Sequence, residues 1–278
     1  MSPKGARLSN VRSLLKRLIE VNAIMLAIDR RGEILDRIQQ EGSAKVPELS
    51  AEFKVTEETI RRDLEKLEAE GHITRTYGGA VLNKGTSADL SINIREGRNP
   101  EGKNRIAKKV AELIENGDTI MLDSSTTALF VARHLKEKSR VTLITNSIRI
   151  PVEIAGNGGD IEVIITGGTL RSTSMSLVGK RTSDMLDHYF VNKAIISCKG
   201  LDPVLGTFEP HEGEAEVKKK MRNNAELLIL AADYTKFNRK SFAKTMEAAQ
   251  IDILVTDRRL PPEEEEQLKR QNVRVIYA

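Results

Sequence analysis

At 278 residues the chain is long enough for two domains, and its composition, 39% hydrophobic and 30% charged, is typical of globular proteins. No apolar run approaches the roughly 20 residues that a membrane helix needs, so we expect no membrane partner. The single cysteine, Cys198, excludes an internal disulfide framework and suits a cytoplasmic setting. Four scattered histidines give no zinc-ligand spacing, and the sequence predicts neither a metal nor another cofactor.

The formal net charge of +4 is unevenly distributed along the chain. Residues 1–24 carry five Lys and Arg against one Glu, so the remaining chain is neutral. Residues 29–84 carry ten Lys and Arg against twelve Asp and Glu. Any nucleic-acid contact made by this segment must therefore come from individually placed charges and not from a broad basic surface.

Residues 1–28 are interpreted as an N-terminal extension, because apolar side chains recur in them at helical spacing. Two interpretations stay open. In the first, the extension is a frayed or appended helix, or residues upstream of a natural start at Met25; in the second, it is an arm that pairs subunits or touches DNA.

Residues 29–83 predict three helices followed by a hairpin. Ile34, Leu35 and Ile38 give the first helix an apolar stripe, and Gly42 follows its end. The second helix opens at Val46-Pro47 and ends near Phe53, with the proline close to its first position.

The third helix is predicted to begin after Thr56, a suitable N-cap, and to end at Gly71. Alternation over residues 72–77 predicts a strand, which a Gly78-Gly79 turn joins to a second strand over 80–82. This order of elements is that of a winged helix–turn–helix, in which the third helix enters the major groove of DNA.

The third helix has two contrasting faces. At 100° per residue, Ile60, Leu64 and Leu67 share a core-facing side. The opposite side consists of Glu58, Thr59, Arg62 and Lys66, with Arg61 on the flank. Arginine can bond guanine with two parallel hydrogen bonds, and threonine can bond phosphate or touch a thymine methyl. The sequence therefore predicts a DNA-contacting face.

An alternative stays open for the same residues: Arg61 and Arg62 could pair with Glu57, Glu58 or Glu65 on an ordinary surface helix. From the hairpin, the side chains of Arg75, Tyr77 and Lys84 are placed to hold backbone phosphates.

Residues 84–103 are polar and interrupted by glycine, which predicts a linker before a second domain over 104–278. In that domain short apolar strands alternate with helical patterns, which predicts an α/β domain with a mostly parallel sheet. The predicted strands are Thr119–Leu122, Val141–Thr145, Ile161–Thr166, Lys193–Ser197, Leu227–Ala231, Ile251–Thr256 and Val273–Tyr277. The predicted helices are Ile106–Glu115, Ala128–Glu137, Ser147–Ala155, Glu212–Asn223 and Pro262–Gln271.

Polar motifs follow these strands, where open α/β sheets bind ligands. The clearest lies between a strand and a helix and consists of Asp123, Ser124, Ser125, Thr126 and Thr127. Hydroxyl and backbone N–H groups at a helix N-terminus suit a phosphate, although a plain N-cap with solvated serines is the alternative.

Four further strand ends carry polar or glycine residues that we assign to the same ligand site: Thr145, Asn146, Gly167, Gly168, Arg171, Lys199, Gly200, Asp202, Asp233 and Lys236. Arg171 and Lys199 can neutralise a phosphate, whereas the aspartates can accept hydrogen bonds from sugar hydroxyls. Each end taken singly is an ordinary turn; the five together predict one pocket. Residues 211–214 either line this pocket or cap the following helix.

The sequence of the first domain closely resembles the DeoR family of bacterial sugar-responsive regulators. The resemblance is carried by Val46-Pro47-Glu48-Leu49-Ser50, by the run from Val55 to Leu67, and by Gly71 and Arg75-Thr76-Tyr77-Gly78-Gly79-Ala80. It extends over essentially all of residues 30–257. It implies that Lys45 and the stretch from Thr56 to Arg62 contact DNA.

The family resemblance also implies a repressor with an effector domain that senses a phosphorylated sugar or related metabolite. It implies a homo-oligomer, dimer or tetramer, on a double-stranded operator. The five strand ends match the family's effector-domain pattern with one departure: Ser125 stands where the family often has Gly. If that position needed a left-handed backbone, serine would resist it.

Two alternatives remain. The effector domain is similar in fold to ribose-5-phosphate isomerase A, which raises the possibility of an enzyme. Rough alignment places Lys218-Lys219-Lys220 where that enzyme has its Glu base, so we predict that binding is retained and catalysis is absent, with no catalytic residue. Glu212 and Glu214 keep the enzyme open as an alternative. The second alternative is a regulator whose ligand is not phosphorylated.

Overall fold

The computed structural model describes residues 27, 29–35, 37–38, 41–69, 72–82, 90–157 and 160–278. The interpretations of residues 1–26, Gly71 and Lys84 lie outside this set. The chain divides into two compact units, Met1–Thr86 with Asn93–Arg98 and Ser87–Ile92 with Asn99–Ala278. After the roles that the sequence predicts for them, we refer to them as the DNA-binding unit and the sensor unit.

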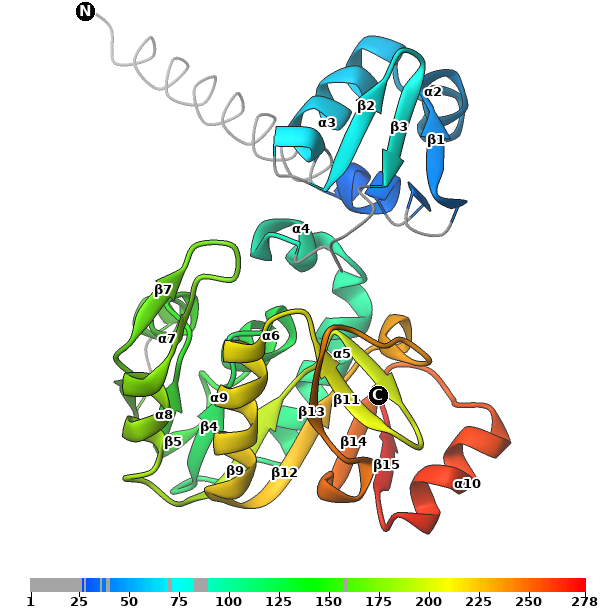
Figure 1. The fold of residues 1–278 in the computed structure, drawn as a ribbon. Coiled ribbons are helices and arrows are strands. Elements are labelled where there is room, and N and C mark those ends of the chain that lie inside the picture. Colours follow the sequence, from blue (N-terminus) through cyan, green and yellow to red (C-terminus); the bar gives the residue numbers. More distant parts are fainter. Residues whose placement is uncertain are drawn as a thin grey trace, which may run out of the picture. The chain divides into compact units, whose positions relative to one another are not determined.

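The DNA-binding unit is a winged helix (Figure 1). Its first helix includes residues 29–35 and 37–38. The elements that follow are β1 (Ser43–Lys45), α2 (Val46–Phe53), α3 (Glu57–Ala69), β2 (Ile73–Thr76) and β3 (Gly79–Leu82). The strands form an antiparallel sheet in the order β1-β3-β2. β1 was not predicted, because three residues are too few to show an alternating pattern.

The predicted apolar stripes form the core of this unit. Ile34, Leu35 and Ile38 of the first helix and Ile60, Leu64 and Leu67 of α3 are all buried. Gly42 has a φ of +80°, and its N–H donates to the Ile38 carbonyl at 2.8 Å, as expected of a glycine after a helix end.

Gly79, at the start of β3, allows a close approach between strands. A Cβ at this position would lie 2.0 Å from the Ala44 carbonyl oxygen of β1 and 2.9 Å from the Lys45 Cα. The pairing of β1 with β3 therefore depends on a residue without a side chain.

Two helices occupy much of the segment that was predicted to be a linker. α4 spans Ile92–Gly97 and α5 spans Pro100–Glu112, six residues earlier than the predicted start at Ile106. Asn99 caps α5, because its side chain accepts a hydrogen bond from the Gly102 N–H and Pro100 occupies the first helical position. The apolar periodicity begins only at Ile106, which is why the sequence placed the helix start too late.

The sensor unit is built on a seven-stranded parallel sheet in the order β15-β14-β12-β9-β4-β5-β6. All seven predicted strands are present: β4 (Thr119–Leu122), β5 (Ser139–Thr145), β6 (Asp160–Ile165), β9 (Val191–Ile196), β12 (Ala225–Ala231), β14 (Ile253–Thr256) and β15 (Arg274–Tyr277). From β4 the chain moves outward through β5 and β6, then returns to β9 on the other side of β4. The carboxyl ends of β4 and β9 therefore flank a topological switch point.

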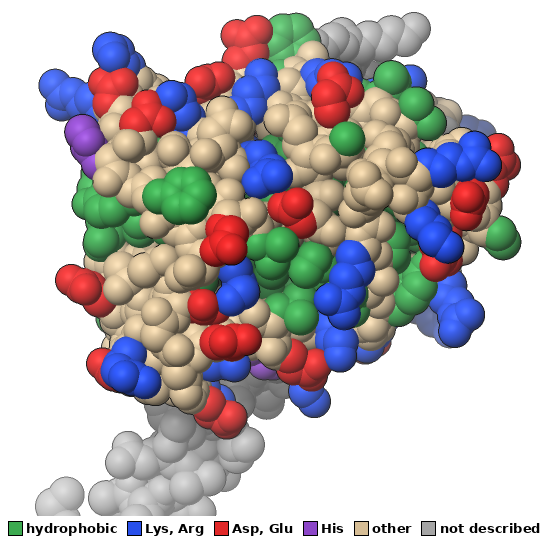
Figure 2. Space-filling view, turned by 90° about the horizontal axis from the view of Figure 1, so that it is seen from below, with side chains coloured by type: hydrophobic (Ala, Val, Ile, Leu, Met, Phe, Trp, Pro, Cys, Tyr) green, Lys and Arg blue, Asp and Glu red, His purple; other side chains and the backbone are tan. Residues whose placement is uncertain are grey.

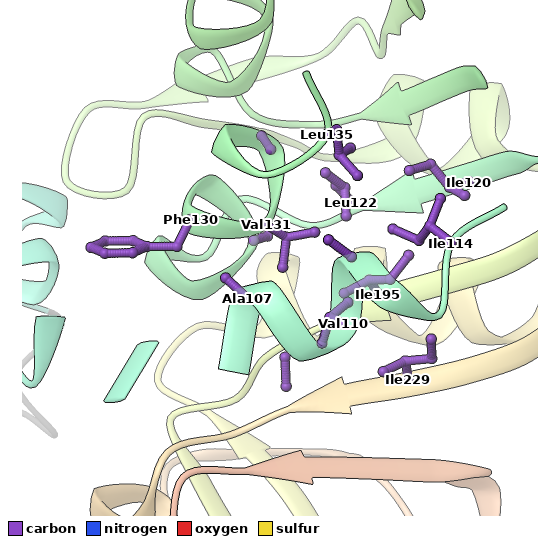
Figure 3. Packing of buried hydrophobic residues seen from close by; sticks show 14 of the residues in the cluster. Ala107, Val110, Ile114, Ile120, Leu122, Phe130, Val131, Leu135, Ile195 and Ile229 are labelled. Atoms are coloured by element: carbon purple, nitrogen blue, oxygen red, sulfur yellow. The ribbon is translucent and has the colours of Figure 1, made fainter. Parts of the chain in front are cut away.

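Helices cover both faces of this sheet, as alternate buried residues require. Ile120 and Leu122 of β4 pack with α5, α6 (Thr126–Arg133) and α7 (Arg149–Asn157). Met121 faces the other way and packs with α8 (Lys180–Leu186), α9 (Glu212–Asn223) and α10 (Pro262–Arg270). Figure 3 shows Val110 of α5 and Ile114, just beyond the end of that helix, lying against sheet residues such as Ile120 and Ile229.

Short antiparallel elements complete the sensor unit, and the sequence did not predict them. β7 (Thr169–Arg171) pairs with β8 (Ser176–Val178), and β10 (Gly200–Asp202), β11 (Gly206–Glu209) and β13 (Ala243–Met246) form a second small sheet. The 3-10 turns η1 (Tyr234–Lys236) and η2 (Ala248–Gln250) lie in connecting loops. With three or four residues each, these elements are too short for a clear period.

Within the described ranges, no helix is long and apolar enough to cross a bilayer, and no cluster of three or more His, Cys, Asp or Glu could hold a metal ion. Figure 2 shows one face of the molecule, on which acidic and basic side chains are interspersed around exposed hydrophobic ones. This face carries no broad basic surface, in agreement with the neutral charge balance of the chain beyond residue 24.

Candidate functional site

The predicted cap of the recognition helix α3 is confirmed by its geometry. The Thr56 Oγ1 accepts a hydrogen bond from the Thr59 N–H at 3.3 Å and lies 2.9 Å from the Thr59 Oγ1. Glu57 and Glu58 occupy the first turn, where the helix dipole favours negative charge. Arg62 and Lys66 are exposed, opposite the buried Ile60 and Leu64.

The exposed arginines of α3 pair with acidic residues one turn earlier. The Arg61 guanidinium lies 2.9 Å from the Glu57 carboxylate, and that of Arg62 lies 3.2 Å from the Glu58 carboxylate. The side chains of Arg61 and Arg62 remain 58% and 73% exposed. Exposed pairs of this spacing contribute only about 0.3–0.5 kcal/mol, so a phosphate or a base edge can replace the glutamate.

Asp63 has a role that the sequence analysis missed. It is buried, and its carboxylate accepts hydrogen bonds from Arg30 at 2.5 Å and Arg31 at 3.4 Å. Asp63 thus connects α3 to the first helix through two ion pairs. The clue available in the sequence was position: Asp63 lies three residues after Ile60 and four before Leu67, on the core side.

The β2–β3 hairpin, which forms the wing, lies beside α3, and a groove lies between them. The groove has a volume of about 310 Å³, and its lining includes Arg61, Glu68, Arg75 and Tyr77. The Glu68 carboxylate accepts from both the backbone N–H (2.8 Å) and the guanidinium (2.6 Å) of Arg75, and these hydrogen bonds lower the pKa of Glu68. Tyr77 is fully exposed at the hairpin turn.

Lys45, the remaining candidate for DNA contact, precedes α2. Its ammonium lies 3.5 Å from the Glu48 carboxylate, and its side chain is 76% exposed. Like the arginines of α3, it is placed on the surface with an acidic neighbour that an incoming phosphate can replace.

In the sensor unit, Asp123 lies at the switch point between β4 and β9. It is fully buried, and its carboxylate accepts from the Ser125 N–H at 3.0 Å and from the Ser197 N–H at 2.9 Å. Because Ser197 follows β9, this side chain joins the carboxyl ends of the two central strands.

Lys218 of α9 completes the network around Asp123. Its ammonium lies 3.1 Å from the Asp123 carboxylate, donates to the Ser197 carbonyl at 2.8 Å and also donates to Glu209. Burial raises the pKa of the Glu209 carboxyl. For Lys218, burial by itself would lower the pKa of the ammonium, but the neighbouring carboxylates outweigh burial and raise it. The sequence analysis noted Lys218 but not Glu209, and assigned neither to the site.

Glu214 is the centre of a second buried network. Its carboxylate accepts hydrogen bonds from Ser124 (3.2 Å), Arg171 (2.8 Å), Ser174 (2.7 Å) and Ser176 (2.6 Å). It thereby joins the loop after β4 to the β7–β8 hairpin.

His211, three residues before Glu214, caps α9, because its Nδ1 accepts from the Gly213 N–H at 3.0 Å. The interpretation of residues 211–214 as a helix cap is therefore confirmed for His211, and a place of Glu214 in the ligand pocket stays a prediction.

The loop after β4 leads directly into α6. Ser125 is the N-cap of this helix, and its Oγ accepts a hydrogen bond from the Ala128 N–H at 3.0 Å. Its φ is −72°, so this position needs no left-handed backbone and serine is not strained there. Thr126 and Thr127 form the first turn, where backbone N–H groups lack partners within the helix, and both side chains are buried.

The ends of β5 and β6 lie beside the β7–β8 hairpin. The Asn146 amide donates to the Leu177 carbonyl at 3.0 Å, whereas its Oδ1 is buried without a partner; Thr145 accepts from the Ser147 N–H. Gly167 has open space around it. Gly168 has a φ of +133°, and a Cβ there would lie 2.1 Å from the Thr182 Oγ1.

The remaining candidates follow β9 and β12. Lys199 directly precedes β10, and Gly200 is the first residue of that strand; a Cβ on Gly200 would lie 2.2 Å from the Arg239 carbonyl oxygen. Asp233 is buried, with its carboxylate bonded to the Thr235 N–H and 3.9 Å from the Lys236 ammonium. Burial by itself would raise the pKa of the Asp233 carboxyl. The charge of Lys236 and the hydrogen bonds from Thr235 outweigh burial, so the net effect is a lowered pKa.

Asp202 is differently placed from the other candidates. Its carboxylate accepts from the Val204 and Leu205 N–H groups of the β10–β11 turn and lies 3.6 Å from the Lys240 ammonium. Burial by itself would raise the pKa of Asp202, but the hydrogen bonds from the two turn N–H groups outweigh burial, so the pKa is lowered. These contacts stabilise a turn, and they do not link Asp202 to the networks of Asp123 or Glu214.

A winged helix with an exposed recognition helix, followed by a doubly wound α/β unit with polar strand ends, defines a DNA-binding transcription regulator with a sensor domain. Residues 30–86 match the DeoR-like helix-turn-helix domain, and residues 98–258 match the DeoR C terminal sensor domain. The chain belongs to the DeoR family, and it is therefore a transcription regulator and not an enzyme.

Curated relatives support this assignment over most of the chain. An uncharacterized HTH-type transcriptional regulator, YulB of Bacillus subtilis, is 38% identical over 90% of this chain and 96% of its own length. A putative aga operon transcriptional repressor of Escherichia coli O157:H7 is 33% identical over 89% and 93%. The glycerol-3-phosphate regulon repressor of Escherichia coli K12 is 30% identical over 84% and 92%.

Among solved structures, ribose 5-phosphate isomerase A of Methanocaldococcus jannaschii is 18% identical and matches 50% of this chain and 55% of its own, with a TM-score of 0.37. A likeness at this level has no bearing on activity.

Proposed function

We propose that the chain represses a sugar-metabolism operon and that a phosphorylated sugar, bound at the carboxyl edge of the sensor sheet, releases it from the operator. The observation that carries the proposal is the convergence of polar residues at the switch point, where Asp123 joins the ends of β4 and β9 and Glu214 joins the β4 loop to the β7–β8 hairpin. Two of the relatives named above are repressors, one of them of a glycerol-3-phosphate regulon.

In this proposal the first turn of α6 holds the phosphate, since its backbone N–H groups and the hydroxyls of Thr126 and Thr127 face an anion favourably. Lys236, whose side chain is 20% exposed beside the buried Asp233, supplies a cation. Gly167 and Gly168 allow the backbone to approach the ligand closely.

The ligand assignment is tested by thermal unfolding of the full chain with glucose 6-phosphate, fructose 6-phosphate, glycerol 3-phosphate and the matching unphosphorylated compounds. At 100 times its dissociation constant a ligand stabilises the native state by about 2.7 kcal/mol. We expect a phosphorylated compound of this panel to stabilise the wild type, and we expect Lys236→Met to reduce this stabilisation. The control Lys240→Met, at an exposed lysine paired with Asp202, should leave it unchanged. Stabilisation only by an unphosphorylated sugar would instead favour the alternative ligand class.

The DNA contact is assigned to Thr59, Arg61, Arg62 and Lys66 of α3, with Thr56, Glu57 and Glu58 at its start and Lys45, Arg75 and Tyr77 beside it. A homodimer or tetramer would present two such helices to half-sites about one turn of DNA apart.

We expect Arg62→Ala to weaken binding to a duplex selected by the purified protein and to relax its sequence preference, with about 1–3 kcal/mol lost if Arg62 contacts a base. Arg270→Ala removes an equally exposed arginine, 3.4 Å from Glu266 at the same helical spacing on α10, and is the matched control. Unchanged affinity and preference in Arg62→Ala would refute the recognition assignment. Reporter transcription in the presence and absence of the protein distinguishes repression from activation.

A further inference from the structure

The segment that joins the two units is divided between them in an unusual order. Asn93–Arg98, most of α4, groups with the DNA-binding unit, whereas Ile92 before it and Asn99 after it belong to the sensor unit. Within the DNA-binding unit, the Arg98 guanidinium donates to the Gly32 carbonyl of the first helix at 3.3 Å. Six residues of this unit are thus flanked on both sides by residues of the other.

The residue before the segment is anchored on the β7–β8 hairpin. The Ile92 N–H donates to the Thr173 carbonyl at 2.8 Å, and the Ile92 side chain is buried. Thr173 lies in the turn of the hairpin, between Arg171 and Ser174, whose side chains both donate to Glu214. A movement of Glu214 or of the hairpin therefore reaches Ile92 through one hydrogen bond.

The residue after the segment is anchored on Asp257, which follows β14. The Asn99 amide donates to the Asp257 Oδ2 at 2.9 Å, and the Asp257 Oδ1 accepts from the Tyr234 N–H at 2.8 Å. Tyr234 directly follows Asp233 in the loop after β12. The Asp257 side chain is 1% exposed, so neither hydrogen bond competes with bulk water.

The fit around the second anchor is close. A Cβ on Gly102, in the first turn of α5, would lie 2.2 Å from the Asp257 Oδ2 and 2.3 Å from the Asn99 Nδ2. Asn99 itself has a φ of +46°, a conformation that asparagine tolerates better than most residues. The backbone is held in this conformation by two contacts, from the side-chain oxygen to the Gly102 N–H and from the side-chain nitrogen to Asp257.

We propose that Asn93–Arg98 is the element through which effector occupancy controls the DNA-binding unit, with Ile92–Thr173 and Asn99–Asp257 as its two anchors. The proposal rests on the proposed function, because the β7–β8 loop that Glu214 of α9 contacts and the loop at Asp233 border the proposed effector site. A ligand that shifts either loop changes the anchor of one end of the segment. Coupling between sites is reciprocal in binding free energy, so DNA binding must change effector affinity by the same factor. If the coupling runs through this segment, DNA binding also changes the hydrogen bonds at Asp257.

Asn99→Gly tests the second anchor, since glycine accepts the positive φ but removes the contact with Asp257. Asn272→Gly is the matched control, because Asn272 also has a positive φ (62°) and is exposed after α10. The measured quantity is the ratio of operator dissociation constants with and without the sugar phosphate that stabilises the wild type. Typical allosteric ratios are about 5–150-fold. We expect Asn99→Gly to bring the ratio close to 1 with ligand affinity within about threefold of wild type, and Asn272→Gly to keep it.

A second measurement needs no effector. Hydrogen exchange of the peptide containing Tyr234 is compared with and without a DNA duplex selected by the purified protein. We expect DNA to change the exchange of this peptide in the wild type and in Asn272→Gly, but not in Asn99→Gly. If Asn99→Gly does not fold, Asn99→Asp takes its place, because it keeps the cap on Gly102 and sets a carboxylate against Asp257.

The outcomes separate the two proposals. Two results would overturn the coupling role. One is an Asn99→Gly variant whose ratio of operator dissociation constants equals that of the wild type. The other is a wild type in which DNA does not change hydrogen exchange of the Tyr234 peptide. If no sugar phosphate stabilises the wild type, the proposed effector class fails. A DNA-dependent change of exchange that requires Asn99 still supports the anchor in that case.

Discussion

Replacing Lys218 by methionine is the most direct test of the network at the switch point. Methionine keeps the volume and the flexible aliphatic stem of lysine, but it removes the ammonium that meets Asp123, Glu209 and the Ser197 carbonyl. Two buried carboxylates then lose their counter-ion, and the Ser197 carbonyl loses a donor.

The magnitude follows from burial. Removing one partner of a buried ion pair costs about 3–5 kcal/mol, because the remaining charge is left uncompensated. In a unit of about this size each kcal/mol lowers the melting temperature by roughly 2–4 °C, so the expected loss is roughly 6–20 °C. Lys180→Met is the matched control, since Lys180 pairs with Asp184 at 2.9 Å but is 86% exposed. It should change stability by less than about 0.5 kcal/mol.

Urea and thermal unfolding followed by far-ultraviolet circular dichroism measure both variants, because the chain has no tryptophan to report by fluorescence. Adding Glu209→Gln to Lys218→Met should recover part of the loss by removing one of the unpaired charges. A loss below about 1 kcal/mol in Lys218→Met would refute the view that this ammonium holds the ends of β4 and β9 together.

Three further results are expected. Gly79→Ala should cost about 1–3 kcal/mol and weaken operator binding, because its Cβ meets the Ala44 carbonyl; Gly78→Ala, with open space around it, should do neither. Asp63→Asn should lower the stability of the DNA-binding unit by roughly 1.5–3 kcal/mol in urea unfolding, since Arg30 and Arg31 lose a charged acceptor. Because the pKa of Asp233 is lowered in the folded state, its ionised carboxylate stabilises the native state at pH values above the unfolded pKa of about 3.9. This stabilisation is lost as the pH falls through the folded pKa. Asp233→Asn should therefore reduce the melting temperature at pH 7 more than at pH 3, and an equal loss at both would contradict this.

The strands and helices that the sequence predicted well contain a run of buried apolar residues or a capped helical pattern. β4 and α9 have the predicted bounds, because residues 120–122 form a buried apolar run and α9 has a polar, capped start. The β7–β8 hairpin and the β10–β11–β13 sheet were missed, since their three-residue or four-residue strands are stabilised by contacts distant in sequence. α5 was started late because its first turn packs through Gly102 and Lys103 and not through an apolar stripe.

The candidate site was predicted in outline and not in detail. Polar residues after apolar strands located Asp123 and the loop to Thr127 correctly at a strand end, because parallel strands share one carboxyl edge. Lys218, the partner of Asp123, lies 95 residues further along the chain, and no local pattern indicates that it would meet both Asp123 and Glu209. The sequence could not show that Asp202 bonds within its own turn, since turn geometry and ligand binding favour the same residue type.

If Arg61 and Arg62 contact DNA as proposed, their pairs with Glu57 and Glu58 have a consequence for how the protein searches a genome. Each arginine already has a carboxylate neighbour, so a stretch of DNA that offers only phosphate oxygen replaces one acceptor by another and gains little. A matching base edge adds a bidentate contact that glutamate at this distance does not provide. Selectivity then comes from weak retention on unrelated DNA, with a shallow dependence of that retention on salt, and the number of molecules free to find the operator stays high.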